Sequence, residues 1–148
     1  MSPLTKPIPL APRGSQRAEA TAARQGAAVL DAHSLAALHQ LDPSGASRLV
    51  QRVMETYRSS LERLLGELTL ARTRHDAASL RLVTHTLKSS SASVGALALS
   101  ALCAQAEQAA RDGQVDDLPS LLDQLVVEAV RVDAAVVQLL SDPTTNAR

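Results

Sequence analysis

Residues 85–96 read HTLKSSSASVGA, which places one histidine and one lysine a single helical turn apart among unusually small side chains. On a helix that turns about 100° per residue, the side chains that point away from His85 form a largely apolar stripe. The stripe consists of Leu80, Val83, Leu87, Ser90 and Val94. This pattern predicts a helix whose apolar stripe is buried and whose exposed face carries His85.

The predicted neighbours of His85 on the exposed face leave room for another protein. They are two cations, Arg81 and Lys88, and two small residues, Ser89 and Ala92. We expect Arg81, Ser89 and Ala92 to form a docking surface around the histidine. Ser90, on the opposite side, would let a neighbouring helix approach closely. Gly95 predicts the tight structural turn that ends the helix, because a residue without Cβ adopts the required backbone conformation.

The order of residues in this stretch resembles the signature of the histidine-containing phosphotransfer (HPt) family, His-x-Leu-Lys-Gly/Ser-Ser-Ser/Ala followed by a Gly-Ala step. Every element except the optional glycine after the lysine is present, and the resemblance runs from about Leu30 to Leu140. It implies a small helical bundle that accepts a phosphoryl group on His85 from a receiver-domain aspartate. The bundle then passes the group to another receiver in a two-component relay that includes a hybrid sensor histidine kinase.

Three further residues are expected near the phosphoryl group. Lys88 lies one turn from His85 and can neutralise part of the added charge. In the family, a polar and a basic residue one turn apart on the following helix often face the phosphorylated histidine, and Glu107 and Arg111 occupy that register. Glutamine is frequent at the first position, so Glu107 places a like charge near the phosphate and we favour Arg111. Alternatively, the two residues form only an exposed i,i+4 pair worth about 0.3–0.5 kcal/mol.

Composition predicts a single all-α domain. The 148 residues suit one domain, Ala and Leu dominate, and Tyr57 and Ile8 are the only aromatic residue and the only isoleucine. The net charge of zero gives no reason to expect nucleic acid as a partner. Cys103, the lone cysteine, is expected to be a small buried hydrophobe. We find no pattern for a membrane span or a signal peptide and expect a cytoplasmic protein.

Hydrophobic periodicity and the positions of the prolines predict how the chain is divided into tails and a helical domain. Residues 1–25 are broken by prolines and mildly basic, and we expect a flexible tail there and a short tail over 143–148. The domain, residues 26–142, is predicted to be an antiparallel up-and-down four-helix bundle with an additional short N-terminal helix across one end. The short helix is expected over 29–41, with Leu35, Leu38 and Leu41 covering that end. The four long helices are expected at 46–74, 77–95, 97–111 and 119–142, with Asp76 capping the second.

Two other classes of function are weighed against the phosphotransfer reading. A binding adaptor or antagonist would dock a receiver domain or a kinase without phosphoryl turnover, and the presence of both His85 and Lys88 argues against it. An enzyme or metalloprotein in a bundle would need inward-facing carboxylates or a Glu-x-x-His pair, whereas the core stripes contain Leu, Val and Ala. No glycine-rich phosphate loop is found, so we expect a phosphoryl carrier and not an autonomous kinase.

No cofactor or metal site is expected in this chain. The resemblance implies that the receiver partner supplies Mg²⁺. No second apolar face is predicted to need covering, and we therefore expect a monomer.

Overall fold

The computed structural model describes residues 29–142, so the tails expected at 1–25 and 143–148 lie outside the described residues. Within 29–142 the chain forms five helices and no strand, which confirms the all-helical prediction. Among these helices we find none with the length and apolar character that a membrane span requires.

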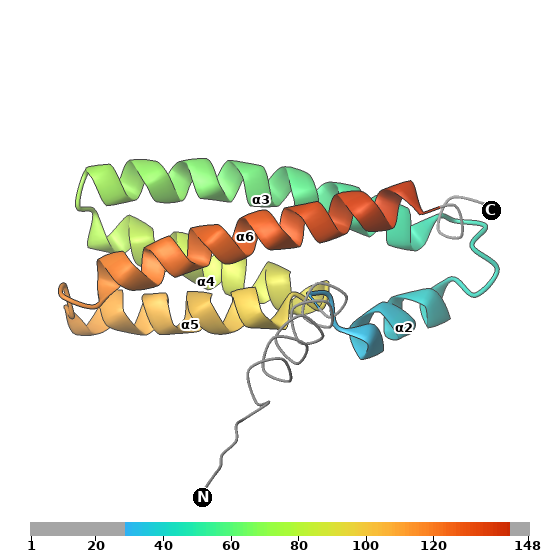
Figure 1. The fold of residues 1–148 in the computed structure, drawn as a ribbon, viewed down its shortest axis with the longest axis horizontal. Helices are drawn as coiled ribbons and strands as arrows, with labels where there is room; N and C mark the ends of the chain where they lie inside the picture. Colours follow the sequence, from blue (N-terminus) through green and yellow to red (C-terminus); the bar gives the residue numbers. More distant parts are fainter. Residues whose placement is uncertain (1–28, 143–148) are drawn as a thin grey trace, which may run out of the picture.

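The four long helices lie side by side, and a short helix lies beyond one end of them (Figure 1). Contacts connect α3 to α4, α4 to α5, α5 to α6 and α6 back to α3, which closes a ring around one core. The short helix α2 contacts α3. The helices span α2 (Ala32–Leu41), α3 (Leu49–Thr73), α4 (Ala77–Ser93), α5 (Leu97–Asp112) and α6 (Leu118–Ser141).

Side-chain hydrogen bonds stabilise the first turns of two of the long helices. The Asp76 carboxylate accepts hydrogen bonds from the backbone N of Ser79 at 3.1 Å and from its Oγ at 2.7 Å, which confirms the predicted cap of α4. Asp42 accepts from the backbone N of Leu49 at 3.1 Å and thereby stabilises the first turn of α3. The helix starts at Leu49, three residues later than predicted, and its N-cap residue Arg48 has a left-handed backbone with a φ of +51°.

The turn between α4 and α5 is joined to the segment before α2. Gly95 has a φ of +84°, a conformation that other residues adopt at a cost. The backbone N of Asp31 donates to the Gly95 carbonyl at 2.8 Å. A Cβ at position 95 would lie 2.8 Å from the Cβ of Ser34, so the close approach of the two segments also requires glycine.

The prediction of the short helix was wrong in two respects. It begins at Ala32 and not at Val29, because the Asp31 carboxylate caps it by accepting from the backbone N of Ser34 at 2.9 Å. Val29 and Leu30 are buried before the helix starts. Leu41 is 75% exposed and does not cover the end of the domain.

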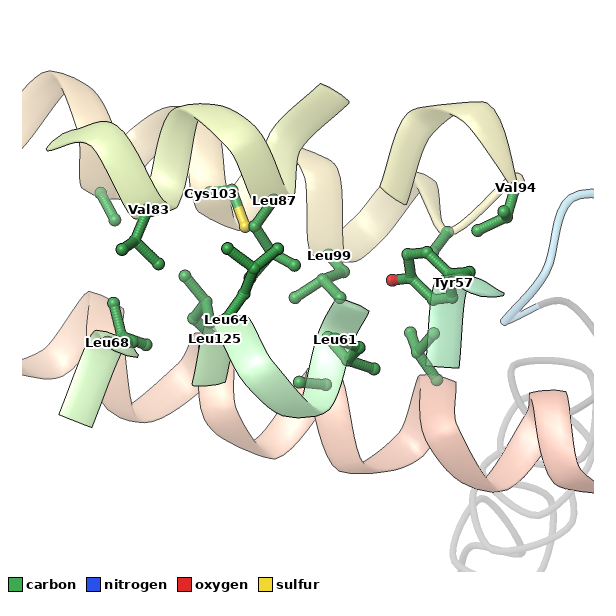
Figure 2. Close-up of a cluster of buried hydrophobic side chains, with 14 of the residues drawn as sticks. Tyr57, Leu61, Leu64, Leu68, Val83, Leu87, Val94, Leu99, Cys103 and Leu125 are labelled. Carbon is green, nitrogen blue, oxygen red and sulfur yellow. The ribbon is translucent and has the colours of Figure 1, made fainter. Parts of the chain in front are cut away.

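The core is built from buried side chains of all four long helices. Figure 2 shows Leu61, Leu64 and Leu68 of α3 across the core from side chains of α4 and α5, with Leu125 of α6 beside Leu64. Cys103 of α5 lies in this core and is fully buried, as predicted, and burial raises the pKa of its thiol to about 12.

One polar contact crosses the core between α3 and α4. The Tyr57 Oη and the Ser91 Oγ lie 2.9 Å apart, and both side chains are buried. Ser90, which was predicted on the core side, is only half-buried. The reason is that α4 packs against both α3 and α5, which widens its buried arc to include Thr84 and Ser91.

An exposed apolar stripe follows one face of α6, although no second apolar face was predicted to need covering. Val127 and Val130 are more than 60% exposed, and Val126 and Val137 are each 37% exposed. Positions 126, 130 and 137 fall on one side of the helix, about a third of a turn away from the buried residues Leu125, Ala129 and Val132.

Candidate functional site

His85 lies on the exposed face of α4, as its surroundings in the sequence predicted. Its side chain is 59% exposed, while Val83 and Leu87 on the other side of the helix are buried. The three residues expected to form a docking surface, Arg81, Ser89 and Ala92, are exposed on the same helix. The structure therefore leaves the imidazole ring accessible to another molecule.

A single carboxylate of α5 brings the charged residues of the site together. Oε2 of Glu107 lies 2.9 Å from Nδ1 of His85 and 3.2 Å from Nη2 of Arg111. Oε1 lies 2.7 Å from Nζ of Lys88. The Glu107 side chain is only 8% exposed, whereas Lys88 is 34% and Arg111 48% exposed. Glu107 thus lies buried at the bottom of the site, while the side chains of His85, Lys88 and Arg111 reach the surface.

The contacts of Glu107 determine its charge. Its pKa lies below the ordinary value, chiefly because the Lys88 ammonium donates a hydrogen bond to it; burial opposes this effect and the contact with His85 adds to it. The carboxylate is therefore ionised near neutral pH and can only accept hydrogen bonds. It follows that Nδ1 of His85 is the donor in their contact. In a neutral ring the lone pair is then on Nε2, which makes no hydrogen bond within residues 29–142.

This geometry changes which of the two α5 residues lies closest to the histidine. The sequence favoured Arg111 as the neighbour of the phosphorylation site, but it is Glu107 that contacts both His85 and Lys88. The i,i+4 pair with Arg111 exists as well. It is not the exposed pair of the alternative reading, because the Glu107 side chain is buried.

The position of Glu107 follows from the register of α5. Ser100, Cys103 and Glu107 are spaced at three and four residues, which places them on one face of the helix. That face packs against α4, since the Oγ of Ser100 donates to the backbone carbonyl of Lys88 at 2.9 Å. Sequence reasoning missed Ser100. The seven-residue spacing between Ser100 and Glu107, two helical turns, could have indicated that both lie on the same face of α5.

Two buried acids correct the prediction that the core faces contain only Leu, Val and Ala. Glu107 and Glu128 are both buried, and Glu128 is paired with Arg131 at 2.9 Å. They do not form a cluster: within the described part of the chain, no three His, Cys, Asp or Glu side chains gather as they would around a metal ion.

Comparisons with known proteins agree with this site. Residues 52–141 match the family described as Hpt domain, a span that contains the cluster formed by His85, Lys88, Glu107 and Arg111. The chain is also similar to the crystal structure of histidine-containing phosphotransfer protein B from Pseudomonas aeruginosa PAO1, with a TM-score of 0.68 and 28% sequence identity. That similarity covers 76% of this chain and 94% of the other chain. No curated protein matches.

Proposed function

Because the chain belongs to the Hpt domain family, we propose that His85 is the side chain on which it carries a phosphoryl group. The chain is a histidine phosphotransfer protein of phosphorelays, in which such proteins interact with receiver domains and kinases. The observation that supports His85 is the contact of its Nδ1 with the ionised carboxylate of Glu107. The rings of the other histidines make no hydrogen bond to a carboxylate of the described residues; they are His33, His39 and His75.

The reaction that this geometry supports is the transfer of a phosphoryl group from an aspartyl phosphate of a receiver domain. The Nε2 lone pair of His85 attacks the phosphorus and forms the P–N bond. The P–O bond to the aspartate breaks, and its electron pair remains on the aspartate carboxylate. The reverse steps deliver the group to a second receiver. Mg²⁺ would be held by the receiver, which also carries the aspartate, so the chain acts as a carrier without autonomous catalysis.

Two cationic side chains lie where they would stabilise the negative charge of the phosphoryl group. Lys88 and Arg111 both contact Glu107 next to His85, and both side chains are partly exposed. A phosphoryl group on Nε2 adds close to two negative charges, which charge-assisted hydrogen bonds from these side chains would stabilise. Lys88 lies on the same helix as His85 and contributes from one turn away.

The exposed surface around His85 supports the docking of a receiver. Arg81, Ser89 and Ala92 surround the histidine on α4, and the small side chains of the latter two leave the ring unobstructed. We infer that this surface contacts the receiver while its aspartyl phosphate reaches Nε2. A hybrid sensor histidine kinase would present its own receiver domain to the same surface.

We also propose that α3–α6 form an antiparallel up-and-down four-helix bundle, with α2 across one end. The closed ring of helix contacts and the short connections support this arrangement. We propose a monomer, because only a few apolar side chains of α6 are exposed, whereas a stable interface takes about 20–30 residues from each partner. Size-exclusion chromatography with light scattering over a range of concentrations tests it. A cytoplasmic location stays a prediction.

The experiment that tests the function compares the wild type with His85→Gln and with His75→Gln, a control that changes an exposed histidine outside the cluster. Each protein is incubated with a phosphorylated receiver domain and Mg²⁺. We expect acid-labile, base-stable phosphate on the wild type and on the control, and none on His85→Gln. Circular dichroism should show equal helicity, since the His85 ring is largely exposed. Absence of label from all three proteins with several receivers would instead support a docking adaptor.

A further inference from the structure

Charge is distributed unevenly over the helical domain. Residues 97–142, which form α5 and α6, carry eight acidic side chains and two basic ones (Lys or Arg). Residues 48–96, which form α3 and α4, carry eight basic side chains and four acidic ones. Residues 1–28, which lie outside the described part of the chain, carry four basic side chains and one acidic one. This segment is therefore attracted to the α5–α6 half of the domain and repelled by the α3–α4 half.

A groove of about 490 Å³ lies between α5 and α6, next to the turn that connects them. Its polar lining residues are Gln105, Gln108, Gln114, Asp117, Ser120 and Gln124. Each glutamine carboxamide offers a donor and an acceptor, as a peptide group does. The carboxylate of Asp117 makes no capping hydrogen bond to α6, so it remains available to a cation. The groove can therefore bind a polypeptide segment that carries basic side chains.

The carboxylates around this groove lack cationic partners. Residues 112–130 contain five acids and no Lys, Arg or His. Two of these acids pair with arginines, Asp123 with Arg72 and Glu128 with Arg131. The other three form no ion pair with another residue of 29–142; they are Asp112, Asp116 and Asp117. This concentration of negative charge favours a basic ligand.

Exposed valines extend the same surface. Val115 of the turn is 72% exposed, and Val127 and Val130 of α6 are 64% and 62% exposed. Contact of these side chains with water is unfavourable, and a ligand with apolar side chains would cover them. Residues 1–28 provide three such side chains ahead of their arginines, Leu4, Ile8 and Leu10. The segment thus matches both the charge and the apolar part of this surface.

We propose that residues 1–28 dock on the α5–α6 face of their own domain, with their arginines at the groove and their apolar side chains on the exposed valines. The segment joins the domain near the α4–α5 turn, because the backbone N of Asp31 donates to the carbonyl of Gly95. The groove lies at the other end of α5, a helix of 16 residues and hence about 24 Å long. The twelve residues from Arg17 to Val29 span up to about 40 Å, which is long enough.

A segment docked on α6 leaves the surface around His85 open, because α4 and α6 are not neighbours in the ring of helix contacts. It also covers the exposed valines without a second copy of the chain, in agreement with a monomer. The segment lies outside residues 52–141, the part of the chain that matches the Hpt domain family. The proposed contact therefore goes beyond phosphoryl transfer.

Paramagnetic broadening in the full chain tests the proposal. A nitroxide is attached to a cysteine introduced by Ser15→Cys. Cys103 stays unlabelled, because it is fully buried and burial raises the pKa of its thiol to about 12. The amide signals of Gln114 and Val127 are compared with that of Leu82, before and after reduction of the nitroxide. Leu82 is the matched control, because it is exposed on α4 near the α3–α4 turn, which lies at the same end of the domain as the α5–α6 turn (Figure 1).

We expect the signals of Gln114 and Val127 to lose most of their intensity while the nitroxide is oxidised, and the signal of Leu82 to keep it. The same loss at all three amides, or no loss at Gln114 and Val127, would overturn the proposal, because the segment would then not distinguish the two faces. A mixture of ¹⁵N-labelled chains without nitroxide and spin-labelled chains without ¹⁵N identifies the occupant. Broadening in this mixture would assign the contact to a second copy and contradict docking within one chain.

A charge variant tests why the segment docks. Asp116→Asn combined with Asp117→Asn removes two carboxylates of the turn, and Glu55→Gln combined with Glu62→Gln is the matched control, because it removes two exposed acids of α3. The first variant should regain most of the intensity at Val127, and the control should not. Unchanged broadening in the first variant would contradict electrostatic docking. None of these measurements uses phosphoryl transfer, so their outcome is independent of the proposed function.

Discussion

Nζ of Lys88 lies 2.7 Å from Oε1 of Glu107, so the lysine one turn after His85 is already paired before a phosphoryl group arrives. The contact joins α4 to α5 at the level of the histidine and holds Lys88 close to it. A phosphoryl group on His85 would compete with Glu107 for this ammonium group. The strength of the pair therefore bears on both the transfer rate and the stability of the domain.

Replacing Lys88 by Ala should slow phosphoryl transfer to His85 by about tenfold or more without abolishing it. A hydrogen bond to a charged group contributes roughly 1.5–3 kcal/mol, and Arg111 remains to stabilise part of the phosphoryl charge. Rapid-quench measurement of transfer from a phosphorylated receiver gives the rate. Arg63→Ala is the control, because Arg63 also pairs with a glutamate but lies on α3. Equal rates for Lys88→Ala and wild type would show that Lys88 is a structural partner of Glu107 and takes no part in phosphoryl transfer.

Replacing Gly95 by Ala should destabilise the domain by about 1–3 kcal/mol, measured by urea unfolding. The added Cβ would meet the Cβ of Ser34 at 2.8 Å, and the φ of +84° is strained for alanine. Gly113→Ala separates the two effects, since its φ is +70° but nothing lies within 4 Å of the new Cβ. It should cost less than Gly95→Ala.

Gly66 provides the opposite control in the same series. It lies within α3, with nothing within 4 Å of an added Cβ, so Gly66→Ala should stabilise the protein by about 0.5–1 kcal/mol. If Gly95→Ala were as well tolerated as Gly66→Ala, the contact between the α4–α5 turn and residues 31–34 would be absent in solution.

Replacing Tyr57 by Phe should destabilise the domain by about 1–2 kcal/mol, because the buried Ser91 hydroxyl loses its partner. A second change, Ser91→Ala, removes the orphaned hydroxyl and should recover part of the loss in the Tyr57→Phe background. Thermal unfolding of the two single variants and the double variant gives the coupling free energy. Additive effects would show that the two hydroxyls do not interact.

The depressed pKa of Glu107 predicts an acid-sensitive contribution to stability. A carboxyl whose pKa is lower in the folded than in the unfolded chain stabilises the fold above its unfolded pKa of about 4.3. This contribution is lost as the pH falls through the lower, folded value. Glu107→Gln should therefore show a smaller loss of unfolding free energy than wild type between neutral pH and the acid range. Asp31 and Asp76 also have lowered pKa values, so part of the loss of unfolding free energy in acid should remain in both proteins.

The local parts of the structure were predictable because short-range physics determines them. The period of the leucines and valines predicted the long helices, and Asp76 and Gly113 mark ends that depend only on neighbouring backbone. The start of α2 carries the same kind of local signal, since the Asp31 carboxylate accepts from the backbone N of Ser34. Its attachment to the rest of the domain was not predictable in this way, because the backbone N of Asp31 donates to the carbonyl of Gly95, which is 64 positions away in the chain.

The sequence by itself determined that the domain is helical, that His85 lies on the exposed face of its helix and that Lys88 is one turn away. These follow from a fixed rotation per residue along one helix. The tertiary structure alone decided that Ser91, and not Ser90, faces Tyr57 and that Glu107 is buried against both His85 and Lys88. The physical reason is that packing against neighbouring helices sets the rotation of α4 and α5 about their axes. The hydrophobic period of a single helix contains no information on those neighbours.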